Sequence, residues 1–228
     1  MSKQNGKDLI VNFKAVVFDM DGTLLDTLAD LGDAMNRVLV QHGFPVQPLD
    51  AYRHHVGSGA DQLVARALPA QVRADEALRA RCLQDFLREY EAGWKIRTGL
   101  YDGVPELLDA LVARGIPMAV LTNKPQAFAE LCMSEFLGRW NFSLTLGQMP
   151  GVPVKPDPAG PMQVISHLGV QPREILYLGD TDVDMRTAVN SGMYPVGVLW
   201  GFRGEQELLD AGAAAILTHP MELVKFLD

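Results

Sequence analysis

The sequence predicts an α/β protein with a doubly wound parallel sheet and a helical domain inserted after the first strand. Two observations predict this fold. From about residue 100 onward, short apolar runs alternate with helix-like stretches, and the runs are continuously apolar, as in strands covered on both faces. The segment 28–95 breaks this rhythm, because it contains helix-like runs but no convincing strand. Strand–helix alternation favours parallel neighbours joined by crossover helices.

The apolar run at 15–17 is the first expected strand, and the other elements follow in order. Further strands are expected at 117–121, 143–146, 175–178, 195–199 and 214–217. Helices are expected between them at 104–114, 125–137, 159–168, 182–191 and 205–210. Glycine commonly ends a helix, and it stands just past four of the helix-like stretches, at Gly115, Gly169, Gly192 and Gly212.

The inserted segment contains helix-like runs at 31–41, 61–68 and 75–90. We therefore expect a core formed by residues 1–27 and 96–228 and a helical insertion formed by residues 28–95. The hinges between them are expected near Thr27 and Leu100.

Composition excludes several classes of protein. With 228 residues, 48% hydrophobic and 21% charged, the chain is typical of a soluble globular protein. Its net charge of −8 argues against a nucleic-acid or anionic-membrane surface. No apolar run is long enough to span a bilayer, and no signal peptide is recognisable. Cys82 and Cys132 are expected to be buried, reduced thiols, and a cytoplasmic location follows by default. A monomer and a homodimer both remain open.

Polar side chains follow four of the predicted strands. They are DMDGT at 19–23, TNK at 122–124, Lys155 in a proline-rich loop, and DTDVD at 180–184. Ligands of doubly wound sheets collect at the carboxyl ends of the strands, so these groups are expected to meet in one site. Asp19 and Asp21 would repel each other there, and a divalent metal, a shared proton or a split of roles would offset the repulsion. The acids at 180–184 lack the glycine and the closing glutamate of an EF-hand, which argues against calcium.

The assembled groups suit phosphoryl transfer. A carboxylate nucleophile is ionised at pH 7 and needs no base, but it must attack an anion. Two unit charges about 4 Å apart repel by roughly 4 kcal/mol at an effective dielectric constant near 20. A magnesium ion held by Asp19 and Asp180 would offset this repulsion, and Lys155 would add a second positive charge. Thr122 could donate a hydrogen bond to a phosphoryl oxygen.

At these four motifs the chain resembles the haloacid dehalogenase superfamily, and within it the phosphoglycolate-phosphatase-like branch. The resemblance covers nearly the whole chain and extends to YDGVPEL at 101–107, KPDP at 155–158 and VLWG at 198–201. It implies a Rossmann-like core, a helical cap of the C1 type made by the insertion, and Mg²⁺ as cofactor. It also implies that Asp19 is the nucleophile and forms an aspartyl-phosphate.

The resemblance implies a role for each remaining site residue. Asp21 would protonate the leaving oxygen and then activate water, while its backbone carbonyl ligates the metal beside Asp19 and Asp180. Lys155 would neutralise phosphoryl charge and orient the nucleophile. The substrate-binding residues would be Thr122, Asn123 and Lys155, together with Gly57, Ser58 and Gly59 of a cap loop. Thr23 and Asp184 would lie in the second shell of the metal.

We therefore expect a magnesium-dependent phosphomonoesterase for a small phosphorylated metabolite, with phosphoglycolate as the first candidate. Alternatives are a phosphatase for sugar phosphates (including amino sugar acids), nucleotides or pyrophosphate, and a phosphosugar mutase of the β-phosphoglucomutase type. Family members that cleave carbon–halogen bonds lack an acid at the place of Asp21. The TNK motif at 122–124, where the mutases typically carry serines, favours hydrolysis. A non-catalytic binding module would have lost one of the acids, and none is missing.

Overall fold

The computed structural model describes residues 12–227, and its core is a six-stranded sheet with the strand order β5-β4-β1-β6-β7-β8. Every pair of neighbouring strands is parallel. The strands are β1 Ala15–Phe18, β4 Met118–Pro125, β5 Phe142–Gln148, β6 Ile175–Gly179, β7 Tyr194–Val198 and β8 Ala215–Leu217. The parallel sheet predicted from the apolar runs is confirmed, with β1 near its centre.

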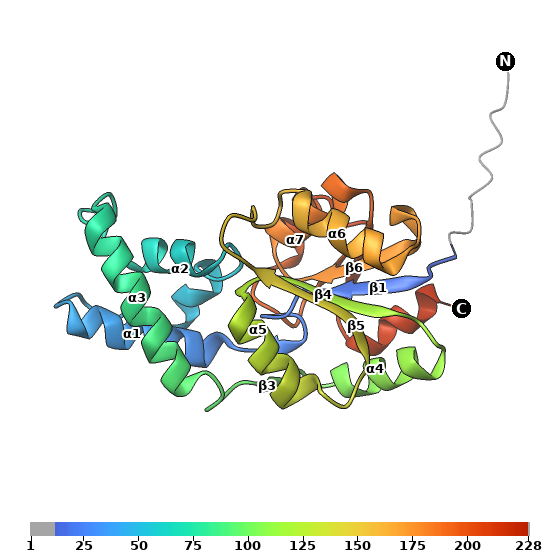
Figure 1. Ribbon diagram of the computed structural model, residues 1–228, viewed down its shortest axis with the longest axis horizontal. Helices are drawn as coiled ribbons and strands as arrows, with labels where there is room; N and C mark the ends of the chain where they lie inside the picture. The colour runs from blue at the N-terminus through green and yellow to red at the C-terminus, as the bar shows by residue number, and fades with distance from the viewer. Residues whose placement is uncertain (1–11, 228) are drawn as a thin grey trace, which may run out of the picture.

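Helices cover both faces of this sheet (Figure 1). They are α4 Val104–Ala113, α5 Gln126–Cys132, α6 Ala159–Leu168, α7 Asp182–Ser191 and α8 Glu205–Asp210. A π-helical turn, Met133–Leu137, continues α5, and short 3₁₀ helices lie at Pro172–Glu174 and Pro220–Phe226.

Alternate residues of β1 face opposite sides of the sheet, as in any strand. Ala15 and Val17 belong to the apolar cluster that contains residues of α6 and α7. Val16 and Phe18 belong to the cluster that contains residues of α4 and α5. All four side chains are buried, so this strand has no solvent face and needs no polar alternation.

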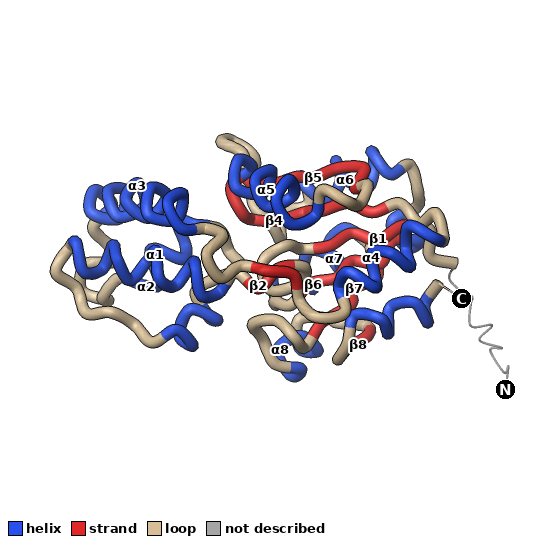
Figure 2. The backbone as a smooth tube through the Cα atoms, turned by 90° about the horizontal axis from the view of Figure 1, so that it is seen from below, coloured by secondary structure: helices blue, strands red, loops and turns tan. Residues whose placement is uncertain are grey.

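The inserted segment forms helices that lie together beyond one end of the sheet (Figures 1 and 2). They are α1 Leu28–Gln41, the 3₁₀ helix Leu49–His54, α2 Ala60–Ala67 and α3 Glu76–Gly93. A two-stranded antiparallel ribbon, β2 Leu25–Asp26 and β3 Gly99–Leu100, lies where the chain leaves the core and returns to it. The ribbon is too short for its pattern to be read from the sequence. The strand arrows of Figure 1 point toward these helices, so the insertion lies over the carboxyl ends of the strands.

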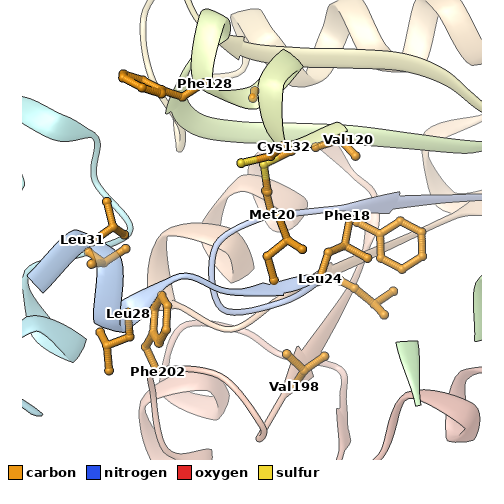
Figure 3. Packing of buried hydrophobic residues seen from close by; sticks show 14 of the residues in the cluster. Phe18, Met20, Leu24, Leu28, Leu31, Val120, Phe128, Cys132, Val198 and Phe202 are labelled. Atoms are coloured by element: carbon orange, nitrogen blue, oxygen red, sulfur yellow. The ribbon is translucent and has the colours of Figure 1, made fainter. Parts of the chain in front are cut away.

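The apolar core is continuous from the sheet into the insertion. Leu28 and Leu31 of α1 belong to the same buried cluster as Phe18 at the end of β1 and Met20 in the loop that follows (Figure 3). Cys82 and Cys132 are buried free thiols, as expected. Within residues 12–227, none of the helices combines the length and apolar character needed to cross a membrane.

Candidate active site

The four polar motifs meet at the carboxyl edge of the sheet. DMDGT at 19–23 directly follows β1, TNK at 122–124 forms the last part of β4, Lys155 follows β5, and DTDVD at 180–184 follows β6. β4, β1 and β6 are direct neighbours in the sheet, which is why three of the motifs converge. The side chains of Asp19, Thr122, Lys155, Asp180 and Asp184 are all buried there.

The loop after β1 turns sharply enough to bring Asp19 and Asp21 to the same site. The carbonyl of Met20 accepts hydrogen bonds from three following backbone N–H groups, and Gly22 has a φ of +90°. A Cβ atom on Gly22 would also lie 2.2 Å from Asp180 Oδ2. Only glycine tolerates both this conformation and this close approach. The glycine therefore lets the first loop pack directly against the acid of the fourth motif.

Lys155 connects two of the acids. Its ammonium lies 2.9 Å from Asp19 Oδ1 and 2.7 Å from Asp184 Oδ1, and it also contacts the carbonyl of Leu121 and the hydroxyl of Tyr177. The contact with Asp19 is an ion pair whose angles do not meet those of a hydrogen bond, so Asp19 Oδ1 has no hydrogen bond from the described residues. The nucleophile predicted from the sequence is thus held by charge and keeps a free lone pair.

Asn123 fixes the position of Lys155 through the backbone. The Lys155 N–H donates to Asn123 Oδ1, and Asn123 Nδ2 donates to the carbonyl oxygens of Lys155 and Gly57. These contacts occupy the side-chain amide of Asn123, so in this arrangement it orients Lys155 and the Gly57 loop. Thr122 Oγ1 accepts a bond from the Lys124 N–H and keeps its own proton to donate. The assignment of both residues to phosphate binding stays a prediction.

The three acids Asp19, Asp180 and Asp184 form a compact carboxylate cluster. One oxygen of each lies within 4.8 Å of the others. Thr23 Oγ1 and the Phe202 N–H donate to the two oxygens of Asp180. Asp184 accepts from Lys155 and Tyr177 on one oxygen and from Thr181 on the other, so both its oxygens are already engaged.

Burial makes this cluster electrostatically strained. Burial first, and then the charge of Asp184, raise the pKa of Asp19 to about 7, although Lys155 opposes the shift. Burial, followed by the charges of Asp184 and Asp19, also raises the pKa of Asp180 well above its ordinary value. Lys155 is the only basic side chain in an ion pair with the cluster among the described residues.

A divalent cation fits this arrangement. Carboxylate oxygens suit a hard cation such as Mg²⁺, and the cluster has more negative charge than Lys155 can balance. Asp19 and Asp180 have oxygens that could still bind a cation. Both oxygens of Asp184 already accept hydrogen bonds, one of them from Lys155, so Asp184 is better placed to hold Lys155. The Asp21 side chain lies outside the cluster, so its predicted part in metal binding would come from its backbone carbonyl.

Asp21 has a partner to which the sequence reasoning gave no role. The ammonium of Lys124 lies 2.9 Å from Asp21 Oδ1 and 2.8 Å from the hydroxyl of Tyr90, on helix α3 of the insertion. Lys124 follows Thr122 by two residues in β4, and this period places both side chains on the same side of a strand. That spacing was the available signal. The partnership with Tyr90 depends on how the insertion docks and leaves no local trace in the sequence.

A pocket lies between the motifs and the insertion. Asp19, Asp21 and Thr122 contribute to its core side, and apolar side chains of the insertion, including Leu63 and Phe86, line the other. Gly57 and Gly59 line it as well. Ser58 is not among the lining residues, because its hydroxyl accepts a hydrogen bond from Arg66 instead. The loop predicted to face the substrate is therefore at the pocket, with the Ser58 side chain directed elsewhere.

Hydrogen bonds join the insertion to the core around this pocket. Arg53 donates to the carbonyl of Gly201, Arg203 donates to the carbonyl of Val56, and Asn123 donates to the Gly57 carbonyl. The structure thus has the insertion closed over the carboxyl edge of the sheet.

The protein has a doubly wound sheet with buried carboxylates and a lysine at its carboxyl edge, and a helical insertion covers that edge. These features define a class of α/β hydrolases with an acidic site that can hold a metal. The chain belongs to the haloacid dehalogenase-like hydrolase family, whose model matches residues 13–192. The family and fold class predicted from the motifs are therefore confirmed, and the chain is an enzyme of the hydrolase class.

Named relatives are phosphatases. The chain is 36% identical over 193 residues to a phosphoglycolate phosphatase of Pseudomonas putida, covering 83% of this chain and 70% of the relative. It is 36% identical over 220 residues to an N-acetylmuramic acid 6-phosphate phosphatase of Pseudomonas aeruginosa, covering 96% of each. A crystal structure from Lactobacillus delbrueckii subsp. bulgaricus, suggested to be a phosphoglycolate phosphatase, superposes with a TM-score of 0.87 at 30% identity, covering 95% of this chain and 98% of that one.

Proposed function

We propose that this enzyme is a magnesium-dependent phosphomonoesterase that acts on a small phosphorylated metabolite through an aspartyl-phosphate, with phosphoglycolate as the first candidate. The observation that carries the proposal is the buried Asp19–Lys155 ion pair within a carboxylate cluster, because Asp19 of this pair also lines the pocket. A phosphatase needs this combination of a carboxylate nucleophile and nearby positive charge. Named relatives with phosphatase activity support the same reading.

In the first step the Asp19 carboxylate attacks phosphorus. The bond between phosphorus and the ester oxygen breaks, its electron pair stays on that oxygen, and Asp21 donates the proton that completes the alcohol product. Lys155 orients Asp19, and the free proton of Thr122 binds a phosphoryl oxygen. Asp19, Asp180 and the Asp21 carbonyl would hold a divalent cation, which would supply charge neutralisation when bound.

In the second step Asp21, now ionised, takes a proton from water, and the resulting hydroxide attacks the phosphorus of the aspartyl-phosphate. The bond between phosphorus and the Asp19 oxygen breaks, which restores the carboxylate and releases phosphate. Asp21 regains the proton that it donated in the first step, so the cycle balances. In this proposal the insertion acts as a cap, since its contacts with the core close the pocket during the reaction.

An amino sugar acid phosphate is the second candidate substrate. The Pseudomonas aeruginosa relative named for N-acetylmuramic acid 6-phosphate aligns with almost all of this chain. A phosphosugar mutase remains the alternative from a different class, and it would transfer the phosphoryl group back to sugar instead of to water.

The test is phosphate release from a panel of esters with Mg²⁺ and with EDTA. The panel contains phosphoglycolate, N-acetylmuramic acid 6-phosphate, sugar and nucleoside monophosphates, and p-nitrophenyl phosphate. We expect Asp19→Asn to abolish turnover. Asp182→Asn is the matched control, because Asp182 belongs to the fourth motif but pairs with Arg186 away from the cluster. Near wild-type turnover by Asp19→Asn, or no release from any ester by the wild type, would overturn the proposal.

A further inference from the structure

Lys124 is a buried cation at the part of the pocket where the leaving group must lie. Its side chain is 2% exposed, and it lines the pocket together with Asp21 and Tyr90. An ammonium has three N–H donors. Its partners among the described residues are the Asp21 carboxylate and the Tyr90 hydroxyl, which leaves a donor for a third acceptor.

The rest of the leaving-group side offers little polar recognition. Leu31, Leu63, Phe86 and Phe128 line it with apolar surface, and Lys124 is the one basic residue among the described lining residues. Unpaired hydroxyl groups against such walls would lose hydrogen bonds to water without replacement. A leaving group rich in hydroxyls is therefore disfavoured, and an anion that reaches Lys124 is favoured.

Two arginines of the insertion, Arg53 and Arg66, could also bind an anionic leaving group, but both make other contacts. Arg66 donates to the carbonyl oxygens of His54 and His55 and to Ser58 Oγ. Arg53 binds Asp50 and the carbonyl of Gly201. Neither arginine lines the pocket.

Tyr90 provides a second donor beside Lys124. Its hydroxyl oxygen accepts from the Lys124 ammonium, so its own proton can be donated to another group. Burial raises the pKa of Tyr90 above its ordinary value although Lys124 opposes the shift, so the hydroxyl stays protonated at neutral pH. The ring also lies 4.8 Å from the ammonium, which holds the two side chains together.

Distance limits how large the leaving group can be. Lys124 Nζ lies 2.9 Å from Asp21 Oδ1, and Asp21 must lie against the ester oxygen to protonate it. An acidic group on the carbon next to the ester carbon therefore falls within reach of Lys124 and Tyr90.

We propose that Lys124 and Tyr90 bind a carboxylate of the leaving group, so that the enzyme selects phosphate monoesters of short 2-hydroxy acids. This inference rests on the proposed phosphomonoesterase function and assigns its specificity to two residues, one from the core and one from the insertion. A carboxylate has two oxygens, which suits one ammonium donor and one hydroxyl donor side by side.

The experiment compares two substrates that differ at one group. Phosphoglycolate carries the carboxylate, and 2-hydroxyethyl phosphate has a neutral hydroxymethyl group in its place. We expect the wild type to favour phosphoglycolate in kcat/KM by about 10-fold or more, the range of a charged hydrogen bond. Tyr90→Phe should raise KM for phosphoglycolate by about 10-fold and change KM for 2-hydroxyethyl phosphate by less than about twofold.

Lys124→Met should remove the preference between the two substrates. Because Lys124 also touches Asp21, kcat falls for both, and the ratio of the two kcat/KM values is the decisive quantity. Tyr52→Phe is the matched control, since Tyr52 is a buried tyrosine of the insertion whose hydroxyl binds Asn36 outside the pocket. It should leave the ratio unchanged.

Equal losses on both substrates in Tyr90→Phe and Lys124→Met would overturn the inference, because the pair would then act only through Asp21 or packing. So would a wild type that hydrolyses 2-hydroxyethyl phosphate as well as phosphoglycolate, or that acts only on p-nitrophenyl phosphate or N-acetylmuramic acid 6-phosphate. Those results leave the phosphomonoesterase function intact. A wild type inactive on all four esters with Mg²⁺ would instead refute the proposed function itself.

Discussion

Replacing the proposed nucleophile should stabilise the protein while it abolishes turnover. In Asp19→Asn the buried carboxylate becomes a neutral amide of nearly the same shape, and Lys155 keeps its ion pair with Asp184. In the metal-free protein Asp19 faces two other acids within 4.8 Å. The substitution therefore removes repulsion without opening a cavity.

The size of the effect follows from the pKa of Asp19. Burial and Asp184 raise that pKa from 3.8 to about 7 in the folded protein. At about 1.4 kcal/mol per tenfold change, ionising Asp19 at pH 8 lowers the free energy of unfolding by about 4 kcal/mol. The repulsion between two carboxylates at 4.8 Å is about 3 kcal/mol at an effective dielectric constant near 20, which is of the same order. We expect Asp19→Asn to gain about 2–4 kcal/mol at pH 8.

The sign of the pH dependence is fixed by the same shift. The unfolded chain ionises Asp19 near pH 3.8 and the folded chain only near pH 7, so the penalty grows as pH rises between these values. The advantage of Asp19→Asn is therefore complete above about pH 7, shrinks by more than half at pH 5, and disappears below about pH 4.

Urea unfolding in EDTA at pH 8 and pH 5 measures this difference, with Asp182→Asn as the control that should match the wild type. Added Mg²⁺ should stabilise the wild type more than Asp19→Asn, because binding to the folded state alone adds about 2.7 kcal/mol at 100 times the dissociation constant. A metal-free Asp19→Asn protein that unfolds more easily than the wild type at pH 8 would refute the reasoning, as would an advantage that does not depend on pH.

Two further substitutions test other parts of the site, and a third tests an ion pair within the insertion. Gly22→Ala should lower the free energy of unfolding by at least about 2 kcal/mol and weaken magnesium activation, because its Cβ would lie 2.2 Å from Asp180 Oδ2; thermal unfolding unchanged within 1 °C would contradict this. Asp21→Asn should accumulate phosphoenzyme detectable by intact-mass measurement with p-nitrophenyl phosphate, and normal steady-state turnover would exclude its proton-transfer role. A hydrogen bond from His42, the main cause, lowers the pKa of Asp85 below 3.8, so its stabilisation is present above pH 3.8 and lost as pH falls further. Circular dichroism should show that Asp85→Asn unfolds at a higher pH during acid titration, and an unchanged midpoint would contradict the assignment.

The convergence of the four motifs could be predicted from the sequence because topology leaves little choice. Continuous apolar runs such as 175–178 predict buried parallel strands, and the carboxyl ends of neighbouring parallel strands lie along one edge. β1, β4 and β6 are neighbours, so Asp19, Thr122 and Asp180 had to meet once those strands were correctly identified. The limits of the insertion at residues 28 and 95 stay a prediction, since the crossing is made by the short ribbon β2–β3.

The contacts of the TNK motif could not be predicted in the same way. The phosphate-binding role of Asn123 stays a prediction, and the bonds of its side chain to backbone groups of Lys155 and Gly57 were not foreseen. Lys124 received no role, although it pairs with Asp21 and Tyr90. The contacts with Gly57 and Tyr90 depend on where the insertion docks on the core, and those with Lys155 and Asp21 depend on the conformations of two loops. Hydrophobic periodicity specifies neither.

Four hydrogen bonds around the pocket hold the insertion against the core, and they differ in whether the accepting group is a backbone carbonyl or a side chain. Arg53, Arg203 and Asn123 all bond to backbone carbonyls on the opposite side, so the accepting positions can change side chain without losing the bond. Each such bond contributes about 1 kcal/mol net, or somewhat more from a charged donor, so the three bonds together add only a few kcal/mol to the closed arrangement. The fourth bond, from Lys124 to Tyr90, is the one of these four that is accepted by a side chain of the insertion. Closure can therefore persist while the pocket changes its substrate, and Tyr90 is the position where closure and specificity are coupled.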